Sequence, residues 1–200
     1  MKTNDKTRRL VMMSFVGIAG LYASPVFAFK KSDAEKLIKN LTNDVLGAVN
    51  EQKSEDIMFS RFEEIFSKYA DVPLIARKAL GPTWRGPSKA QTSAYVSAFR
   101  CYMARYYGKR FEEFLGSEII VSNSRKTSGG FLVGSNIILK DGSSYQAQWH
   151  VIDARGKYLM YNLFLEGVSV LSDVRVQIGS MLDKRAGSID RLIEHLNSKS

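Results

Sequence analysis

Hydrophobic side chains recur every three or four residues through the first half of the chain, and this spacing predicts a series of helices. A capping box of Ser32 and Glu35 is expected to begin the first helix. A second helix is expected over about residues 55–70. Asp71 is expected to cap a short third helix that ends at Gly81.

A longer helix is predicted to follow a second capping box, formed by Ser88 and Gln91. Large side chains recur at every fourth position of this helix, which gives it one buried face. They are Tyr95, Phe99, Met103 and Tyr107.

The hydrophobic pattern changes to alternation after Gly116, which predicts four strands between residues 117 and 166. Turn signals separate the strands at Gly129–Gly130, Asp141–Gly142 and Arg155–Gly156. In the last strand Tyr161, Leu163 and Leu165 are expected on one face. Two helices, over about 171–185 and 188–196, are expected to close the chain. We therefore predict an α+β fold with a curved antiparallel four-stranded sheet and about six helices packed over one face.

The first 28 residues have the three parts of a secretory signal peptide. Four basic residues precede an apolar run over residues 10–23, and Val26-Phe27-Ala28 offers a cleavage site. This run of 14 residues is shorter than the roughly 20 that a membrane-spanning helix needs. The sequence therefore predicts a cleaved leader, 1–28, and a single exported domain, 29–200, in the bacterial periplasm.

The chain is basic, but its expected export limits the partners that its positive charge could attract. The formal net charge is +9, and a leader with four basic residues and one acid accounts for +3, which leaves 9 − 3 = +6. Nucleic acid is not expected as a partner of an exported protein. The surplus positive charge suits anionic lipid head groups or acidic protein surfaces, and equally simple solubility.

The residues that usually carry catalysis or bind metal are few. The chain has two histidines, His150 and His195, and one cysteine, Cys101, at spacings that fit no zinc site. It lacks a glycine-rich phosphate loop and a Gly-x-Ser-x-Gly elbow. No enzyme activity, metal or cofactor is expected. If the protein were an enzyme, Asp153 and Glu166 would be the candidates for a buried carboxylate base.

Two short motifs resemble the MlaC family, also called the toluene-tolerance or ABC-transporter auxiliary family. The first is Leu80-Gly81-Pro82-Thr83-Trp84-Arg85 with Gln91 seven residues after the tryptophan, and the second is Glu166-Gly167-Val168-Ser169 followed by Arg175. Further positions match in the same order from about Ser32 to Leu196. They are Phe66, Tyr69, Asp71, Phe99, Tyr106 and Tyr107.

The last strand, over residues 157–162, departs from the family pattern at two positions. A tyrosine stands where the family usually has a tryptophan, and Asn162 stands where it usually has an aspartate. The second change removes a negative charge from an expected polar cluster with Arg85 or Arg175. It is also compatible with a divergent branch of the family that handles hopanoids.

The resemblance implies a cone-like fold, related to that of nuclear transport factors, with helices wrapped round a sheet and an apolar cavity between them. It implies a monomeric periplasmic phospholipid carrier that buries acyl chains and leaves the head group outside. The implied partners are an outer-membrane lipoprotein complex and an inner-membrane transporter with its substrate-binding ring. Two alternatives stay open: a carrier of hopanoids or other apolar lipids, and an envelope adaptor without a ligand.

Two sets of candidate site residues follow from the resemblance and the predicted faces. The expected lipid contacts, each of which is equally compatible with an ordinary core, are Tyr69, Ile75, Trp84, Phe99, Met103, Tyr107, Val133, Ile137, Trp149, Val151, Tyr161 and Leu163. The expected structural polar cluster, or alternatively the cavity mouth, comprises Arg85, Gln91, Glu166, Ser169 and Arg175. A one-residue error in strand phase would exchange the two faces of a strand.

Overall fold

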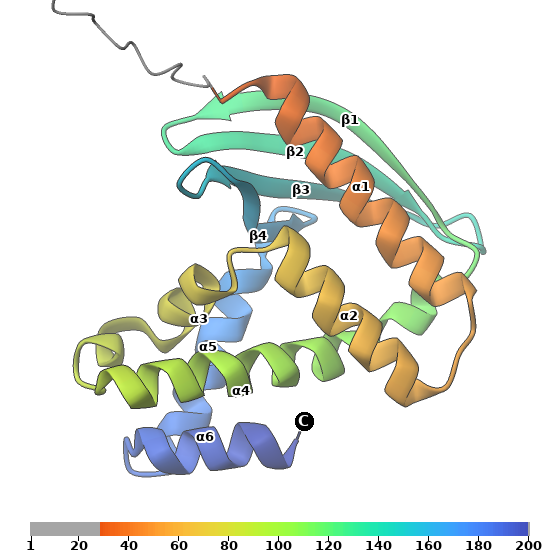
Figure 1. Ribbon diagram of the computed structural model, residues 1–200. Helices are drawn as coiled ribbons and strands as arrows, with labels where there is room; N and C mark the ends of the chain where they lie inside the picture. Colours follow the sequence, from red (N-terminus) through yellow and green to blue (C-terminus); the bar gives the residue numbers. More distant parts are fainter. Residues whose placement is uncertain (1–28, 200) are drawn as a thin grey trace, which may run out of the picture.

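The computed structural model describes residues 29–199 as six α-helices around a curved sheet (Figure 1). The predicted leader, 1–28, lies outside the described residues. The helices are α1 (Lys31–Asn50), α2 (Glu55–Tyr69), α3 (Val72–Leu80), α4 (Lys89–Gly108), α5 (Val170–Asp183) and α6 (Ile189–Ser198). Short 3-10 helices follow α3 and α4, namely η1 (Gly81–Arg85) and η2 (Phe111–Phe114).

Local capping interactions set the starts of the later helices as the sequence predicts. Asp71 accepts a hydrogen bond from the Leu74 backbone N–H at 3.0 Å and begins α3. Before α4, the Gln91 N–H donates to Ser88 Oγ at 3.2 Å, and the Ser88 N–H donates to Gln91 Oε1 at 3.0 Å. Because these bonds satisfy backbone groups that a helix end leaves free, they fix where each helix starts.

The predicted capping box at the start of α1 is wrong. The helix begins at Lys31, so Ser32 lies inside it, and the N-cap residue Lys30 makes no side-chain cap. Glu35 is drawn instead towards the sheet, where Ser124 Oγ donates to its carboxylate at 2.6 Å. A contact between distant parts of the chain thus replaces the local one.

The sheet is antiparallel throughout, in the order β1-β2-β3-β4-β5. Its strands are β1 (Glu118–Thr127), β2 (Gly130–Ile138), β3 (Ser144–Asp153), β4 (Tyr158–Leu165) and β5 (Val168–Ser169). The four expected strands are present, and the two-residue β5 adds a fifth. It exists because Glu166 and Gly167, at φ 49° and 80°, reverse the chain in two residues. This turn explains the Glu166-Gly167 motif structurally.

A β-bulge in β4 corrects the predicted phase of that strand. Val151 pairs with Met160, but His150 pairs with Asn162, so Tyr161 is the extra residue. The predicted shared face of Tyr161, Leu163 and Leu165 is therefore interrupted. Met160 takes the inward position opposite Val151, and the Tyr161 hydroxyl forms a hydrogen bond with His150 Nδ1 at 2.8 Å.

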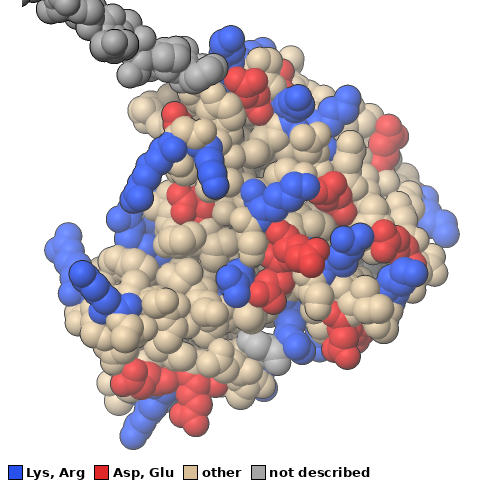
Figure 2. Space-filling view, viewed as in Figure 1, with Lys and Arg blue, Asp and Glu red and all other residues tan. Residues whose placement is uncertain are grey.

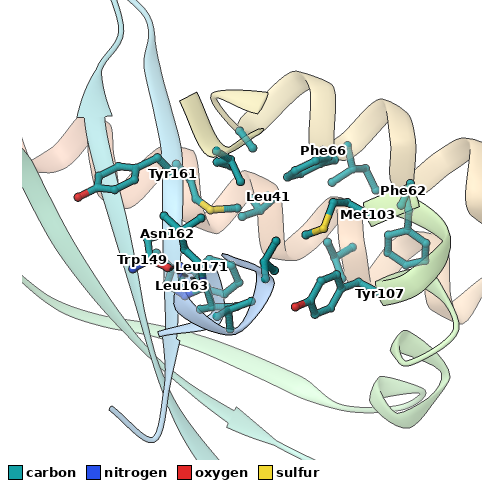
Figure 3. Close-up of a pocket in the computed structure, with 18 of the residues that line it drawn as sticks. Leu41, Phe62, Phe66, Met103, Tyr107, Trp149, Tyr161, Asn162, Leu163 and Leu171 are labelled. Carbon is teal, nitrogen blue, oxygen red and sulfur yellow. Dashed lines mark hydrogen bonds between the residues drawn. The ribbon is translucent and has the colours of Figure 1, made fainter. Parts of the chain in front are cut away.

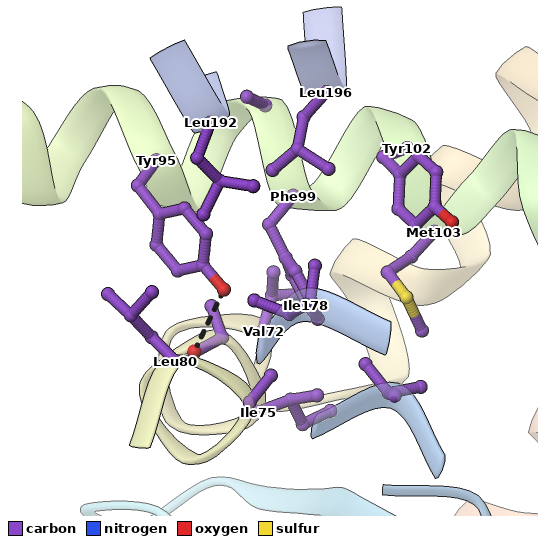
Figure 4. Close-up of a cluster of buried hydrophobic side chains, with 14 of the residues drawn as sticks. Val72, Ile75, Leu80, Tyr95, Phe99, Tyr102, Met103, Ile178, Leu192 and Leu196 are labelled. Carbon is purple, nitrogen blue, oxygen red and sulfur yellow. Dashed lines mark hydrogen bonds between the residues drawn. The ribbon is translucent and has the colours of Figure 1, made fainter. Parts of the chain in front are cut away.

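Two separate hydrophobic cores stabilise the fold. One lies among α3, α4, α5 and α6 and is centred on Tyr95, Phe99, Ile178, Leu192 and Leu196, all fully buried (Figure 4). In the other, α1 and α2 cover the inner face of the sheet, with Ala34, Ile38, Phe62, Val133 and Val151 among its members. Helix α4 contributes to both cores, and Met160 packs against both.

The turn from β1 to β2 requires glycine at only one of its two glycine positions. A Cβ on Gly130 would overlap the backbone carbonyl oxygen of Val151, whereas a Cβ on Gly129 would meet nothing within 4 Å. Gly130→Ala is expected to lower the free energy of unfolding by about 2 kcal/mol or more, because a backbone atom of β3 has to move. Gly129→Ala is the matched control and should stay close to wild type in urea unfolding. Equal stability of the two variants would contradict the described strand pairing.

His150 should make the stability depend on pH. Burial lowers the pKa of His150, and the cationic Arg125 and Lys78 lower it further. Because the unfolded chain then binds a proton at higher pH than the folded one, this site stabilises the fold above about pH 6.5 and loses that contribution as the pH falls. Urea unfolding between pH 7.5 and 5 is expected to show a smaller acid-induced loss for His150→Gln than for wild type. The same loss in both proteins would refute the assignment.

Candidate functional site

An apolar cavity of about 190 Å³ lies where the two cores meet (Figure 3). It is bordered by α1, α2, the C-terminal half of α4, β4 and the first turns of α5, with Ile75 of α3 and Trp149 of β3, and it is partly open to the surface. The lining residues are Leu41, Val45, Phe62, Ile65, Phe66, Ala70, Ile75, Met103, Ala104, Tyr107, Trp149, Met160, Tyr161, Asn162, Leu163, Leu165, Val170, Leu171 and Val174. None of them is charged, so a ligand in this cavity would contact almost only hydrocarbon.

Small side chains keep this space open. Ala70 follows the end of α2 and Ala104 lies on α4, and both are at least 95% buried while lining the cavity. A longer side chain at either position would enter the space. Because both positions are buried, their small side chains leave this space unfilled by the protein.

Two of the polar side chains that line the cavity have partners elsewhere in the protein. Trp149 Nε1 donates to Ser135 Oγ at 2.9 Å within the sheet core. The Tyr161 ring borders the cavity, but its hydroxyl turns away to His150 (Figure 3). Neither group is available to a ligand without breaking an existing bond.

Asn162, a third polar residue of the lining, joins β4 to the start of α5. Its Nδ2 donates to Ser169 Oγ at 3.0 Å, and its Oδ1 accepts from the backbone N–H groups of Leu163 and Leu171 at 2.9 and 3.1 Å. Ser169 Oγ in turn accepts the Ser172 N–H and caps α5. The Asn162 amide thus holds β4 and α5 together at the cavity wall through neutral hydrogen bonds.

The expected charged cluster around position 162 is absent from the described part of the chain. Neither Arg85 nor Arg175 forms an ion pair within residues 29–199. Arg85 is exposed on η1. The Arg175 guanidinium lies against Gly81, where a Cβ would come within 3.3 Å of Nη2. Gly81 has φ 65°, so the glycine of the first motif allows both a left-handed backbone and this close approach.

The remaining polar candidates hold elements together at separate places. Gln91 Nε2 donates to both carboxylate oxygens of Asp190, at 2.9 and 3.1 Å, and so ties α4 to α6. The Glu166 carboxylate accepts the Gln146 backbone N–H beside the β4–β5 turn. The five polar candidates therefore form no single cluster, and none of them lines the cavity.

Six of the twelve apolar candidates line the cavity, namely Ile75, Met103, Tyr107, Trp149, Tyr161 and Leu163. The other six lie elsewhere. The Tyr69 hydroxyl donates to Asp44 of α1 at 2.7 Å, and the Trp84 ring packs edge-on against Tyr95. The rest belong to the two cores, namely Phe99, Val133, Ile137 and Val151. Contact of any of these residues with a lipid stays a prediction.

Sequence reasoning missed the walls supplied by α1, α2 and α5. These comprise Leu41, Val45, Phe62, Ile65, Phe66, Val170, Leu171 and Val174. Their helical spacing identifies buried faces, but a buried face looks the same in sequence whether it packs on a core or borders a cavity.

The two carboxylates proposed for an enzyme lie away from the cavity. Asp153 Oδ1 accepts the Gly156 N–H in the β3–β4 turn, and neither Asp153 nor Glu166 borders the cavity. Within residues 29–199 no cluster of three or more His, Cys, Asp or Glu side chains is placed to hold a metal ion. No helix in this same range combines the length and the apolar character needed to cross a bilayer.

Charges of both signs are interspersed over the face that α1 and α2 present (Figure 2). Ion pairs account for part of this pattern, with Lys68–Asp44 at 2.9 Å and Arg61–Glu51 at 3.7 Å. The surplus positive charge is therefore not gathered into one patch on this face.

A solved structure and a family comparison match most of the chain. The phospholipid-binding protein from Ralstonia solanacearum, solved in complex with a phospholipid, is similar with a TM-score of 0.71 and 16% sequence identity. The match covers 83% of this chain and 96% of that one, and at this identity it establishes the shared fold. The chain also matches the family described as "MlaC protein" over residues 39–198, well over half of its 200 residues. The protein belongs to the MlaC family.

Proposed function

We propose that this protein is a carrier of phospholipid, with the acyl chains held in the cavity between the two cores and the head group outside. The observation that supports this most strongly is the uncharged, apolar lining of the cavity where the two cores meet. The similar fold of a protein that was solved with a phospholipid bound supports the same ligand class. A filled core would have favoured an envelope adaptor without a ligand.

Burial of hydrocarbon explains why such a ligand would be carried rather than released into water. Each buried methylene contributes about 0.8 kcal/mol, so a 16-carbon chain contributes about 12 kcal/mol before ordering costs. We infer that release takes place at a partner that offers another apolar path. The partners proposed are an outer-membrane lipoprotein complex and an inner-membrane transporter with its substrate-binding ring.

The proposed site of action is the periplasm. Residues 1–28 would direct the chain to the periplasm and be removed, and residues 29–200 would act there as a monomeric lipid-binding domain. The neutral hydrogen bonds of Asn162 give no reason to favour a hopanoid over a phospholipid, since they join β4 to the start of α5.

The cavity has to widen to accept a whole chain. An apolar cavity of about 150 Å³ holds a molecule of the size of benzene. The 190 Å³ present here therefore accommodates only part of a long acyl chain. Met103 and Met160 line the cavity with unbranched, flexible side chains that are able to turn aside at small cost.

Filling the cavity should abolish lipid binding without unfolding the protein. In Ala104→Phe the added ring would enter the cavity, and the co-purified lipid should fall from near one per chain to about a tenth of that or less. The measurement is native mass spectrometry of mature protein purified without detergent, followed by solvent extraction to identify the lipid. Ala94→Phe is the matched control, because it adds the same ring on the exposed side of α4 and should keep its lipid.

The proposal fails if the wild-type protein carries no lipid and takes up none from phospholipid vesicles. It also fails if Ala104→Phe, shown to be folded by its unfolding transition, keeps a full complement of lipid. A co-purified hopanoid would keep the carrier function and change the cargo.

A further inference from the structure

Among the described residues, one hydroxyl of the cavity lining makes no hydrogen bond to the protein. The polar atoms of Trp149, Tyr161 and Asn162 are all engaged in the hydrogen bonds described above. The Tyr107 hydroxyl has no hydrogen-bond partner within residues 29–199. Figure 3 shows the Tyr107 ring reaching from α4 towards the middle of the cavity, with its hydroxyl on the side away from its own helix.

The surroundings of Tyr107 keep its hydroxyl protonated and therefore able to donate a hydrogen bond. Burial raises the pKa of Tyr107 to about 12, and the neighbouring Tyr106 adds to the shift. The phenol therefore keeps its proton at any physiological pH and is able to donate. The Tyr106 ring packs edge-on against it at 5.1 Å between centroids, which holds the side chain in place.

We propose that the Tyr107 hydroxyl donates a hydrogen bond to an acyl ester carbonyl of the bound lipid. This inference rests on the proposed phospholipid function and specifies its ligand class. The ester carbonyl is favoured over the phosphate because no charged side chain lines the cavity, and an unpaired phosphate there would lose its hydration without compensation. A neutral carbonyl at the head of the hydrocarbon chain needs only one donor, and Tyr107 supplies one.

The consequence is selectivity for ester-linked chains. An ether lipid of the same head group and chain length fills the cavity equally well but lacks the carbonyl oxygen. A hydrogen bond of this kind contributes a net factor of about 2 to 10 in affinity. Tyr107 would also fix how deep the chain enters, since the carbonyl marks the point where the hydrocarbon begins.

The test is a competition between two lipids that differ only in their two ester carbonyl oxygens. Mature, delipidated protein is incubated with vesicles that contain equal amounts of phosphatidylethanolamine with two 16-carbon ester chains and its diether counterpart. Native mass spectrometry then gives the ratio of the two bound species. Wild type is expected to favour the ester lipid about 2- to 10-fold, and Tyr107→Phe is expected to bring the ratio close to one while total uptake is largely kept.

Tyr95→Phe is the matched control. It removes a hydroxyl from the same helix, but this hydroxyl donates to the Ala76 carbonyl in the core at 3.3 Å, outside the cavity. This variant should keep the wild-type ratio. A wild type that binds both lipids without preference, or a Tyr107→Phe variant that keeps the preference, overturns this inference and leaves the carrier function standing. A wild type that takes up neither lipid overturns both.

Discussion

The structure depends on a volume that neither hydrophobic core fills. This space of about 190 Å³ is partly open to the surface and is lined by uncharged side chains, most of them apolar. The fold tolerates this because each core is closed by itself. Phe99, Leu192 and Leu196 are buried on one side, and Val133 and Val151 on the other, without using the seam between them.

The polar residues around the seam keep its walls in position. Asn162 and Ser169 join the end of the sheet to α5, two elements that border the cavity. These bonds are short-range and mostly neutral, so they hold the walls without bringing charge to the cavity. The wall facing a ligand is then mostly hydrocarbon, and the Tyr107 hydroxyl is a donor there that makes no hydrogen bond within residues 29–199. Such a surface suits a molecule that is almost all chain and carries a neutral acceptor at one end.

Much of the fold was predictable because its signals are local. The Ser88–Gln91 capping box and the Asp71 cap depend on residues three apart, and the structure confirms both. The β4 bulge was not predictable, because one extra residue at Tyr161 changes the strand phase only through its pairing with β3. Which buried residues border the cavity was only half predictable for a related reason. Helical periodicity gives the buried face, and the distance between the two cores decides whether that face meets another side chain or open space.

An experimental crystal structure of the mature protein, purified without detergent, tests the central claim most directly. The account predicts continuous elongated density that runs between α2, α4 and α5 and ends near the Tyr107 hydroxyl, with Met103 or Met160 turned aside. Side chains closed over the seam with no density between the cores, or a lipid bound elsewhere on the surface, would contradict it.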